Sequence, residues 1–238
     1  MGITVIDREK KFQGERKCQL GASCILRSWR NLRMASRLSG LQRALTWADF
    51  GSPRNTAPPP AGQRGTAAQT RVRPSRSIFA EHIPGTRPPQ FRLRDDATIS
   101  IGLDEAQTFV NQWALDRPAP FPTDLLHHEQ GHYDLCALFC RDMFIELMAL
   151  KQQTSSNPQA VMTAAQAIFT RFDGLIAAVH GPYDTDTDHG NTAAQQQRWD
   201  GFISTAFTSP RVPPMSAPDG TLYKVPLADV LRGGGVTL

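Results

Sequence analysis

Residues 125–134 read LLHHEQGHYD, and His128, Glu129 and His132 form an HExxH motif within them. The apolar residues around the motif recur at helical spacing, which predicts a long helix. Two histidines four residues apart on a helix project from one face, about 6 Å apart along the axis, so both imidazoles can reach one zinc ion. Glu129 can then take a proton from a zinc-bound water. The motif predicts a zinc site with His128 and His132 as ligands and Glu129 as the general base.

The helix that carries the motif is expected to run from Pro122, a favourable first-turn residue, to about residue 150. Gly131 lies in its interior, where glycine is about 1 kcal/mol less favourable than alanine, so we expect a packing or access reason for it. Cys136 and Cys140 lie four residues apart on the same helix. We expect both thiols to pack in the core as small apolar side chains.

A catalytic zinc needs a third protein ligand, and the motif helix does not supply one. The only later glutamate is Glu146, fourteen residues beyond His132 and therefore about 21 Å further along the axis. Asp142 lies about 15 Å along the same axis. The third ligand must therefore be a histidine or aspartate from a later part of the chain.

A second helix is predicted over residues 158–180, with Asn157 as its N-cap. If a short turn makes the two helices antiparallel, their matching lengths of about 33 Å bring the loop at residues 181–190 level with the zinc. His189 is the first choice for the third ligand because imidazole is the commonest zinc ligand. Asp186 and His180 are the alternatives.

The same loop has two other interpretations. Asp184, Asp186 and Asp188 match positions 1, 3 and 5 of an EF-hand calcium loop, but His189 stands where that loop needs glycine and Gln195 where it needs glutamate. A structural turn, with aspartate side chains capping backbone amides, also fits the composition. Both interpretations remain open from the sequence.

The remainder of the chain predicts a small sheet and one more helix, and hence an α+β fold. Residues 51–90 are crowded with proline and glycine and are expected to be loop, with a short strand near residues 70–72. Residues 91–93 and 98–103 alternate at strand spacing and predict a hairpin. A third helix is expected over residues 192–207, and the glycines at 233–235 are expected to form a flexible tail.

Charge divides the chain into two unlike parts. Residues 1–94 hold 18 Lys and Arg against 5 Asp and Glu, a net charge of +13, whereas residues 95–238 hold 8 against 17, a net charge of −9, and the two sum to +4. Residues 16–48 contain no acid, so membrane-surface docking or nucleic-acid contact would fit them. No nucleic-acid-binding motif accompanies the arginines, and no specific nucleic-acid partner is predicted. No stretch reaches the roughly 20 apolar residues of a transmembrane helix.

Three motifs together resemble a bacterial family described as secreted zinc-dependent proteases. They are LTWADFGSP at residues 45–53, LLHHEQGHYD at residues 125–134 and YDTDTDHGNTAAQQQRW at residues 183–199, and the resemblance covers about residues 41–207. It implies a zincin-like fold in which a small sheet packs on the active-site helix. It also implies a functional role for residues 183–189 and a periplasmic or secreted location, although this chain has no clear signal peptide.

The sequence thus predicts a basic arm at residues 1–40, a zincin-like domain at 41–210 and a partly flexible C-terminal extension at 211–238. The expected function is that of a zinc metalloendopeptidase, with one Zn²⁺ per chain and a peptide or protein substrate. The oligomeric state is not predicted.

Other side chains have expected roles around the zinc. Tyr183 is a candidate hydrogen-bond donor to the oxyanion, or else a buried packing residue. Asp134 and Asp188 are candidates for orienting the ligand histidines.

Two other classes of function are possible from the sequence. One is a non-catalytic binding protein that zinc stabilises through a closed site of four protein ligands. The other is a protein that binds a surface or nucleic acid through the arginine-rich arm.

Overall fold

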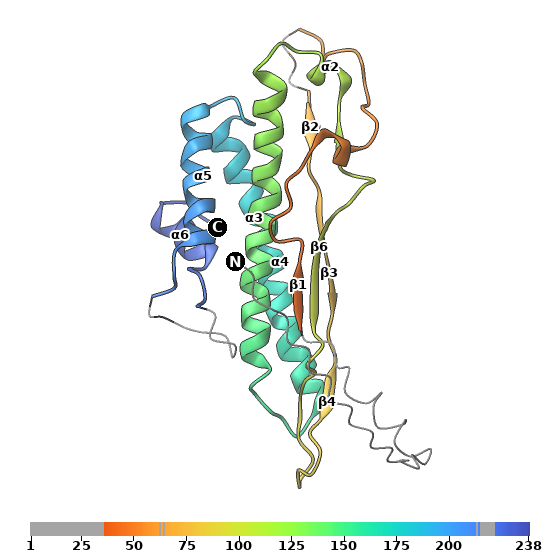
Figure 1. Cartoon of the computed structure of the whole chain (residues 1–238), viewed down its shortest axis with the longest axis vertical. Helices are drawn as coiled ribbons and strands as arrows, with labels where there is room; N and C mark the ends of the chain where they lie inside the picture. Colours follow the sequence, from red (N-terminus) through yellow and green to blue (C-terminus); the bar gives the residue numbers. More distant parts are fainter. Residues whose placement is uncertain (1–35, 62, 64, 213, 215–221) are drawn as a thin grey trace, which may run out of the picture. The chain divides into compact units, whose positions relative to one another are not determined.

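The computed structural model describes residues 36–238 apart from residues 62, 64, 213 and 215–221 (Figure 1). The described residues belong to one compact unit, Ala35–Leu238, in which short strands and helices form an α+β fold. The predicted basic arm lies outside the described residues up to residue 35. Among the described residues, no helix is both long enough and apolar enough to span a bilayer.

Within the part of the chain that the structure describes, seven short strands make three small sheets. The strands are β1 (Arg37–Ser39), β2 (Ala68–Gln69), β3 (Val72–Ser77), β4 (Ala80–His82), β5 (Phe91–Leu93), β6 (Thr98–Leu103) and β7 (Phe109–Val110). The largest sheet has the order β1-β6-β3, with β1 parallel and β3 antiparallel to β6. The other two sheets are the antiparallel pairs β2-β7 and β4-β5.

Residues 51–90, predicted as loop with one short strand near residues 70–72, instead contain β2, β3 and β4. Pro74 lies inside β3, opposite Ile101 of β6. A proline is tolerated there because β3 is an edge strand of the described sheet, and its missing N–H costs no ladder bond on the outer side. The prediction from the many prolines and glycines in this segment therefore gave too few strands.

The predicted hairpin of residues 91–93 and 98–103 is wrong, although both strands exist. β5 pairs with β4, whereas β6 pairs with β3 and β1. The two strands pack on different helices, β5 on α4 and β6 on α3, and this separates them after the turn. β1 lies before residue 40, within the segment predicted as the basic arm, and it pairs with β6.

The helices are α2 (Gln112–Leu115), α3 (Phe121–Leu150), α4 (Pro158–Thr187), α5 (Ala193–Thr208) and α6 (Leu227–Gly233), together with a 3-10 turn, η1 (Trp47–Phe50). The predicted starts are confirmed for α3, which has a proline in its first turn, and for α4, where Asn157 caps the backbone N–H of Gln159 at 2.9 Å. In Figure 1 the strands lie on one side of α3, and α5 and α6 lie on the other.

The expected antiparallel packing of α3 and α4 is confirmed by contacts along their length. His132 lies beside His180 at one end, with 2.9 Å between their Nδ1 atoms. Phe139 packs against Phe172 further along, with 6.5 Å between ring centroids. Cys136, like Cys140, is completely buried in this helix pair, which confirms the core prediction.

α4 extends seven residues beyond its predicted end and passes through Gly181 and Pro182. A proline inside a helix costs about 3 kcal/mol because it removes one backbone hydrogen bond and crowds the preceding turn. The side chains that follow offset this cost: Tyr183 and Thr187 are fully buried, and Asp184 binds histidines of α3. Residues 181–187 of the predicted loop are therefore the last two turns of a helix.

The predicted flexible tail at residues 233–235 is also wrong. α6 buries Leu227 and Leu231 completely, and Gly234 lies against the ring of Phe202 in α5. Asp142 of α3 accepts a hydrogen bond of 2.8 Å from the backbone N–H of Leu227. These contacts hold the end of the chain on the helices.

Candidate metal centre

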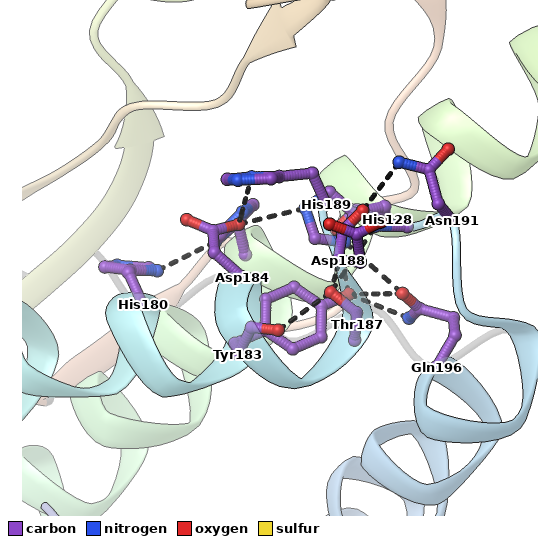
Figure 2. Close-up of polar contacts among 11 residues, drawn as sticks. His128, His180, Tyr183, Asp184, Thr187, Asp188, His189, Asn191 and Gln196 are labelled. Atoms are coloured by element: carbon purple, nitrogen blue, oxygen red, sulfur yellow. Dashed lines mark hydrogen bonds and ion pairs between the residues drawn. The ribbon is translucent and has the colours of Figure 1, made fainter. Parts of the chain in front are cut away.

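Two turns of α3 bring the imidazoles of His128 and His132 to one carboxylate. The Oδ1 atom of Asp184 lies 3.1 Å from Nε2 of His128 and 2.9 Å from Nε2 of His132. Both histidines are buried, and Asp184 is partly buried on the facing turn of α4. Figure 2 shows Asp184 directed toward His128, with Tyr183 beneath. Oδ1 of Asp184 is therefore a shared partner of the two imidazole nitrogens.

Asp184 is the ligand candidate that the sequence analysis missed, because the helix was predicted to end at residue 180. Once α4 continues, His180 and Asp184 lie four residues apart on one face, opposite His132 and His128 of the antiparallel α3. Burial raises the pKa of Asp184, but the hydrogen bonds and charges of the two α3 histidines outweigh it and hold that pKa well below its usual range. Asp184 is therefore ionised.

His189, the first choice from the sequence, stands at the edge of this cluster. Its Nδ1 atom lies 3.5 Å from Oδ1 of Asp184, and its side chain is 65 % exposed. Ligand atoms of His128, Asp184 and His189 all lie within 4.8 Å of one another, so they could hold a metal ion.

The turn that carries His189 has an uncommon backbone. Asp188 and His189 have positive φ angles of 47° and 54°, which side-chain-bearing residues rarely adopt outside functional or tightly constrained sites. Gly190 follows with a φ of 84°, and a Cβ atom there would come within 2.9 Å of the His128 side chain. Only glycine lets this turn lie directly on His128.

The two alternative ligands lie in different places. His180 faces Nδ1 of His132 at 2.9 Å, so it is placed to orient that histidine. Burial, and next the charge of His132, lower the pKa of His180 to about 4, which keeps its imidazole neutral. Asp186 faces away from the cluster and accepts a hydrogen bond of 3.1 Å from Nε1 of Trp199.

The calcium-loop interpretation is wrong for this segment. Its first three ligand positions, Asp184, Asp186 and Asp188, occupy the end of a helix rather than a loop. Asp184 faces the histidines, Asp186 faces Trp199, and Asp188 is the C-cap residue of α4.

Glu129 is placed beside the histidines with an unsatisfied carboxylate oxygen. The residue is 3 % exposed, and its Oε2 atom has no hydrogen-bond partner among the described residues. Leaving a buried carboxylate oxygen unpaired is unfavourable by about 1–3 kcal/mol or more, so such atoms usually have a partner that binds in function. Glu129 is therefore available to a group that enters the site.

An open groove of about 990 Å³ passes the cluster. One wall is the chain from Gly65 to Val72, which includes β2. The floor contains Glu129 and both α3 histidines, and Trp113 and Phe121 add apolar surface near the start of α3. Its volume lies at the upper end of the 300–1,000 Å³ that is typical of pockets for drug-sized ligands.

Tyr183 does not line this groove. Its ring is fully buried and stacks on His128 with 4.7 Å between ring centroids, and its hydroxyl donates a hydrogen bond of 3.0 Å to the backbone carbonyl of His128. Burial raises the pKa of Tyr183 far above its usual value. The ring packs against Gly131, where a Cβ atom would lie 2.1 Å from the tyrosine oxygen. This close approach is the packing reason expected for the glycine, and the oxyanion-donor role expected for Tyr183 does not fit its position.

The expected orienting role of Asp134 does not fit its contacts. Asp134 accepts a hydrogen bond of 3.0 Å from Gln130, and burial raises its pKa to about 6. The side chains that approach Nδ1 of His128 are instead Gln196 and Thr187, at 3.3 and 3.4 Å. A buried glutamine at helical spacing from Trp199 in α5 was the available signal, and it was overlooked.

Comparisons of the chain with protein-family models, curated proteins and solved structures found no match. The resemblance to secreted zinc-dependent proteases therefore rests on the three motifs in the sequence.

Proposed function

We propose that this chain is a zinc-dependent metalloendopeptidase in which His128, His132 and Asp184 hold the metal. The observation that carries the proposal is the convergence of two imidazole nitrogens on one carboxylate oxygen, at 2.9 and 3.1 Å, beside the unpaired carboxylate oxygen of Glu129. Histidine nitrogen and carboxylate oxygen are both common zinc ligands, and three protein ligands are the number that catalytic zinc sites use.

The spacing of these atoms suits a small tetrahedral ion. Zinc-to-ligand bonds of about 2.1 Å imply tetrahedral edges of about 3.4 Å. The three described edges that meet at Oδ1 of Asp184 measure 2.9, 3.1 and 3.5 Å, the last from His189. These three distances from Asp184 support a site of the size that zinc needs.

Zinc held there would supply Lewis-acid chemistry, lowering the pKa of a water molecule toward 7 and polarising the scissile carbonyl. The side chain of Glu129 would take the proton from the attacking water and pass it to the amine nitrogen as the peptide bond breaks. Glu129 is buried, and its Oε2 atom has no hydrogen-bond partner among the described residues. This oxygen is therefore available to take the proton. The neighbouring wall at Gly65–Val72 would hold the substrate chain against the site.

Within the α+β fold, the zincin-like architecture is part of this proposal. It is supported by the strands β3 and β6 packing on the HExxH helix, as the sequence resemblance implies. The endopeptidase specificity is supported by the open groove that passes the site.

The placement of His189 favours a second candidate function. If His189 closes the coordination sphere as a fourth ligand, the site has the closed form of a structural zinc, and the chain is a zinc-stabilised binding protein. The 3.5 Å distance between His189 and Asp184 supports this alternative. The 65 % exposure of the His189 side chain favours the first proposal, because a water molecule can easily replace an exposed ligand.

One pair of variants separates the two functions. Glu129→Gln should abolish hydrolysis of a fluorescently labelled unfolded protein and leave one zinc per chain, measured by elemental analysis. Glu146→Gln, on the same helix and outside the groove, is the matched control and should keep full activity. Activity in Glu129→Gln would refute the proposed base, and a wild-type chain that binds zinc without hydrolysing any peptide would favour the binding protein.

A further inference from the structure

The Nδ1 atom of His128 points away from the proposed zinc and into a buried network of α4 and α5. It lies 3.3 Å from Oε1 of Gln196 and 3.4 Å from Oγ1 of Thr187 (Figure 2). Both partners are buried. An imidazole that binds a metal through Nε2 carries its proton on Nδ1, so these contacts determine whether Nδ1 can hold that proton when the metal binds.

Thr187 can only accept a hydrogen bond from His128. Its hydroxyl donates to the backbone carbonyl of Tyr183 at 2.7 Å, and this uses its one hydrogen. The oxygen also accepts from the backbone N–H of Gly190 at 3.4 Å. Thr187 therefore offers only a lone pair to the imidazole, and Nδ1 of His128 must donate the hydrogen.

Gln196 also turns a hydrogen-bond acceptor toward His128, because Asp200 fixes the orientation of its amide. A side-chain amide can be turned over, but its Nε2 donates to Oδ1 of Asp200 at 3.1 Å and to the hydroxyl of Tyr183 at 2.7 Å. An ionised carboxylate has no hydrogen to give, so it accepts only from the nitrogen side of the amide. The oxygen side is thereby directed at His128.

Asp200 is itself held between two donors at the surface end of this chain of contacts. Its other oxygen, Oδ2, lies 3.2 Å from Nε2 of His127, a more exposed histidine on the adjacent position of α3. The contacts therefore run from the surface through Asp200 and Gln196 to Nδ1 of His128.

We propose that Asp200 and Gln196 are positioning residues that keep the proton of His128 on Nδ1, so that Nε2 offers its lone pair to the metal. The inference rests on the proposed zinc site and adds the residues that prepare it. Without metal, Nε2 faces the ionised carboxylate of Asp184 at 3.1 Å and donates a hydrogen bond to it, and a bound metal ion would take the place of that proton while Nδ1 keeps its own. If the amide turned over, its NH₂ group would face Nδ1, which would then have to present its lone pair, and the one proton of the neutral ring would stay on the ligand atom Nε2.

The test compares zinc affinities of purified chains by competition with a chelating indicator. Asp200→Asn removes the partner that only accepts, so the amide can turn over, and zinc should bind about 10–100-fold more weakly. The double variant Asp200→Asn with Gln196→Glu should restore the affinity, because the introduced carboxylate accepts from both His128 and the new asparagine. Asp229→Asn, at an exposed carboxylate of α6, is the control and should not change the affinity.

Two further readouts separate positioning from a loss of structure. The metal-free variants should unfold at the wild-type temperature within a few degrees, and the cobalt-substituted Asp200→Asn chain should show an altered visible spectrum that the double variant restores. If Asp200→Asn does not fold, Gln196→Met, which has similar length and only a weak sulfur acceptor, should show the same weakened affinity.

The outcomes distinguish the two claims. Unchanged zinc affinity in Asp200→Asn, or no recovery in the double variant, overturns the positioning role and leaves the peptidase proposal standing. A wild-type chain that binds no zinc overturns both.

Discussion

Replacing Gly131 by alanine should destabilise the protein, although alanine is the better helix former. Helix propensity alone predicts a gain of about 1 kcal/mol. The added Cβ, however, would lie 2.1 Å from the hydroxyl oxygen of Tyr183 and 2.7 Å from its Cζ atom. The ring cannot retreat, because it is fully buried between His128 and Trp199.

The size of the effect follows from these two opposing contributions. Overpacking of a dense core costs about 1–3 kcal/mol, and the closeness of this contact indicates the upper end. Subtracting the helix gain leaves a net loss of about 2 kcal/mol, which corresponds to a fall of about 4–8 °C in the unfolding temperature of a chain of this size.

Thermal unfolding followed by circular dichroism, with a chelator present, measures this change. Gly174→Ala in α4 is the matched control, because a Cβ there meets no atom within 4 Å, and it should raise the unfolding temperature by about 2–4 °C. In a Tyr183→Phe background, Gly131→Ala should destabilise less, since the nearest atom is gone. If Gly131→Ala stabilises the protein as much as Gly174→Ala does, the packing account of the glycine is refuted.

Three other predictions concern the metal cluster. Asp184→Asn should lower zinc affinity by at least 10-fold in a chelator competition, while Asp186→Asn, which alters contacts with Trp199 and Arg198, should keep it; equal affinities would remove Asp184 from the proposed ligand set. His189→Ala should weaken zinc binding less than Asp184→Asn does, because the side chain is 65 % exposed, and a larger loss in this competition would make His189 the principal third ligand. The pKa of His180 is lowered from 6.5 to about 4, so the unfolded chain takes up this proton first as the pH falls. The free energy of unfolding of the metal-free chain should therefore keep its full value above pH 6.5 and fall by roughly 3 kcal/mol toward pH 4, as urea titrations would measure. His180→Gln should flatten this decline, and an equally steep decline in the variant would contradict the prediction.

The helices were predictable because their signals are local. Asn157 and the proline after it determine where α4 begins, and helix geometry alone brought its far end to the HExxH motif. The end of α4 was predicted too early because a proline normally ends a helix, and Pro182 lies there. The contacts that outweigh this proline join distant parts of the chain, as when the buried Tyr183 packs against α3. That one error is also the reason why Asp184 was missed as a candidate ligand.

Strand pairing was less predictable because it depends on which helix each strand packs against. β5 and β6 alternate as expected, yet nothing in residues 91–103 indicates that one strand will join β4 and the other β3. The proposed role of Gln196 was not predictable for a similar reason. It depends on contacts with His128 and Asp200, which no sequence spacing indicates.

The central claim is that His128, His132 and Asp184 hold one zinc ion, and the metal content of the purified chain tests it most directly. After expression with zinc and dialysis against metal-free buffer, elemental analysis should find one zinc per wild-type chain and less than about a tenth of that in the variant His128→Ala with His132→Ala, since both imidazole ligands are gone. A wild-type chain that retains no zinc, or a double variant that retains as much as the wild type, would contradict the account.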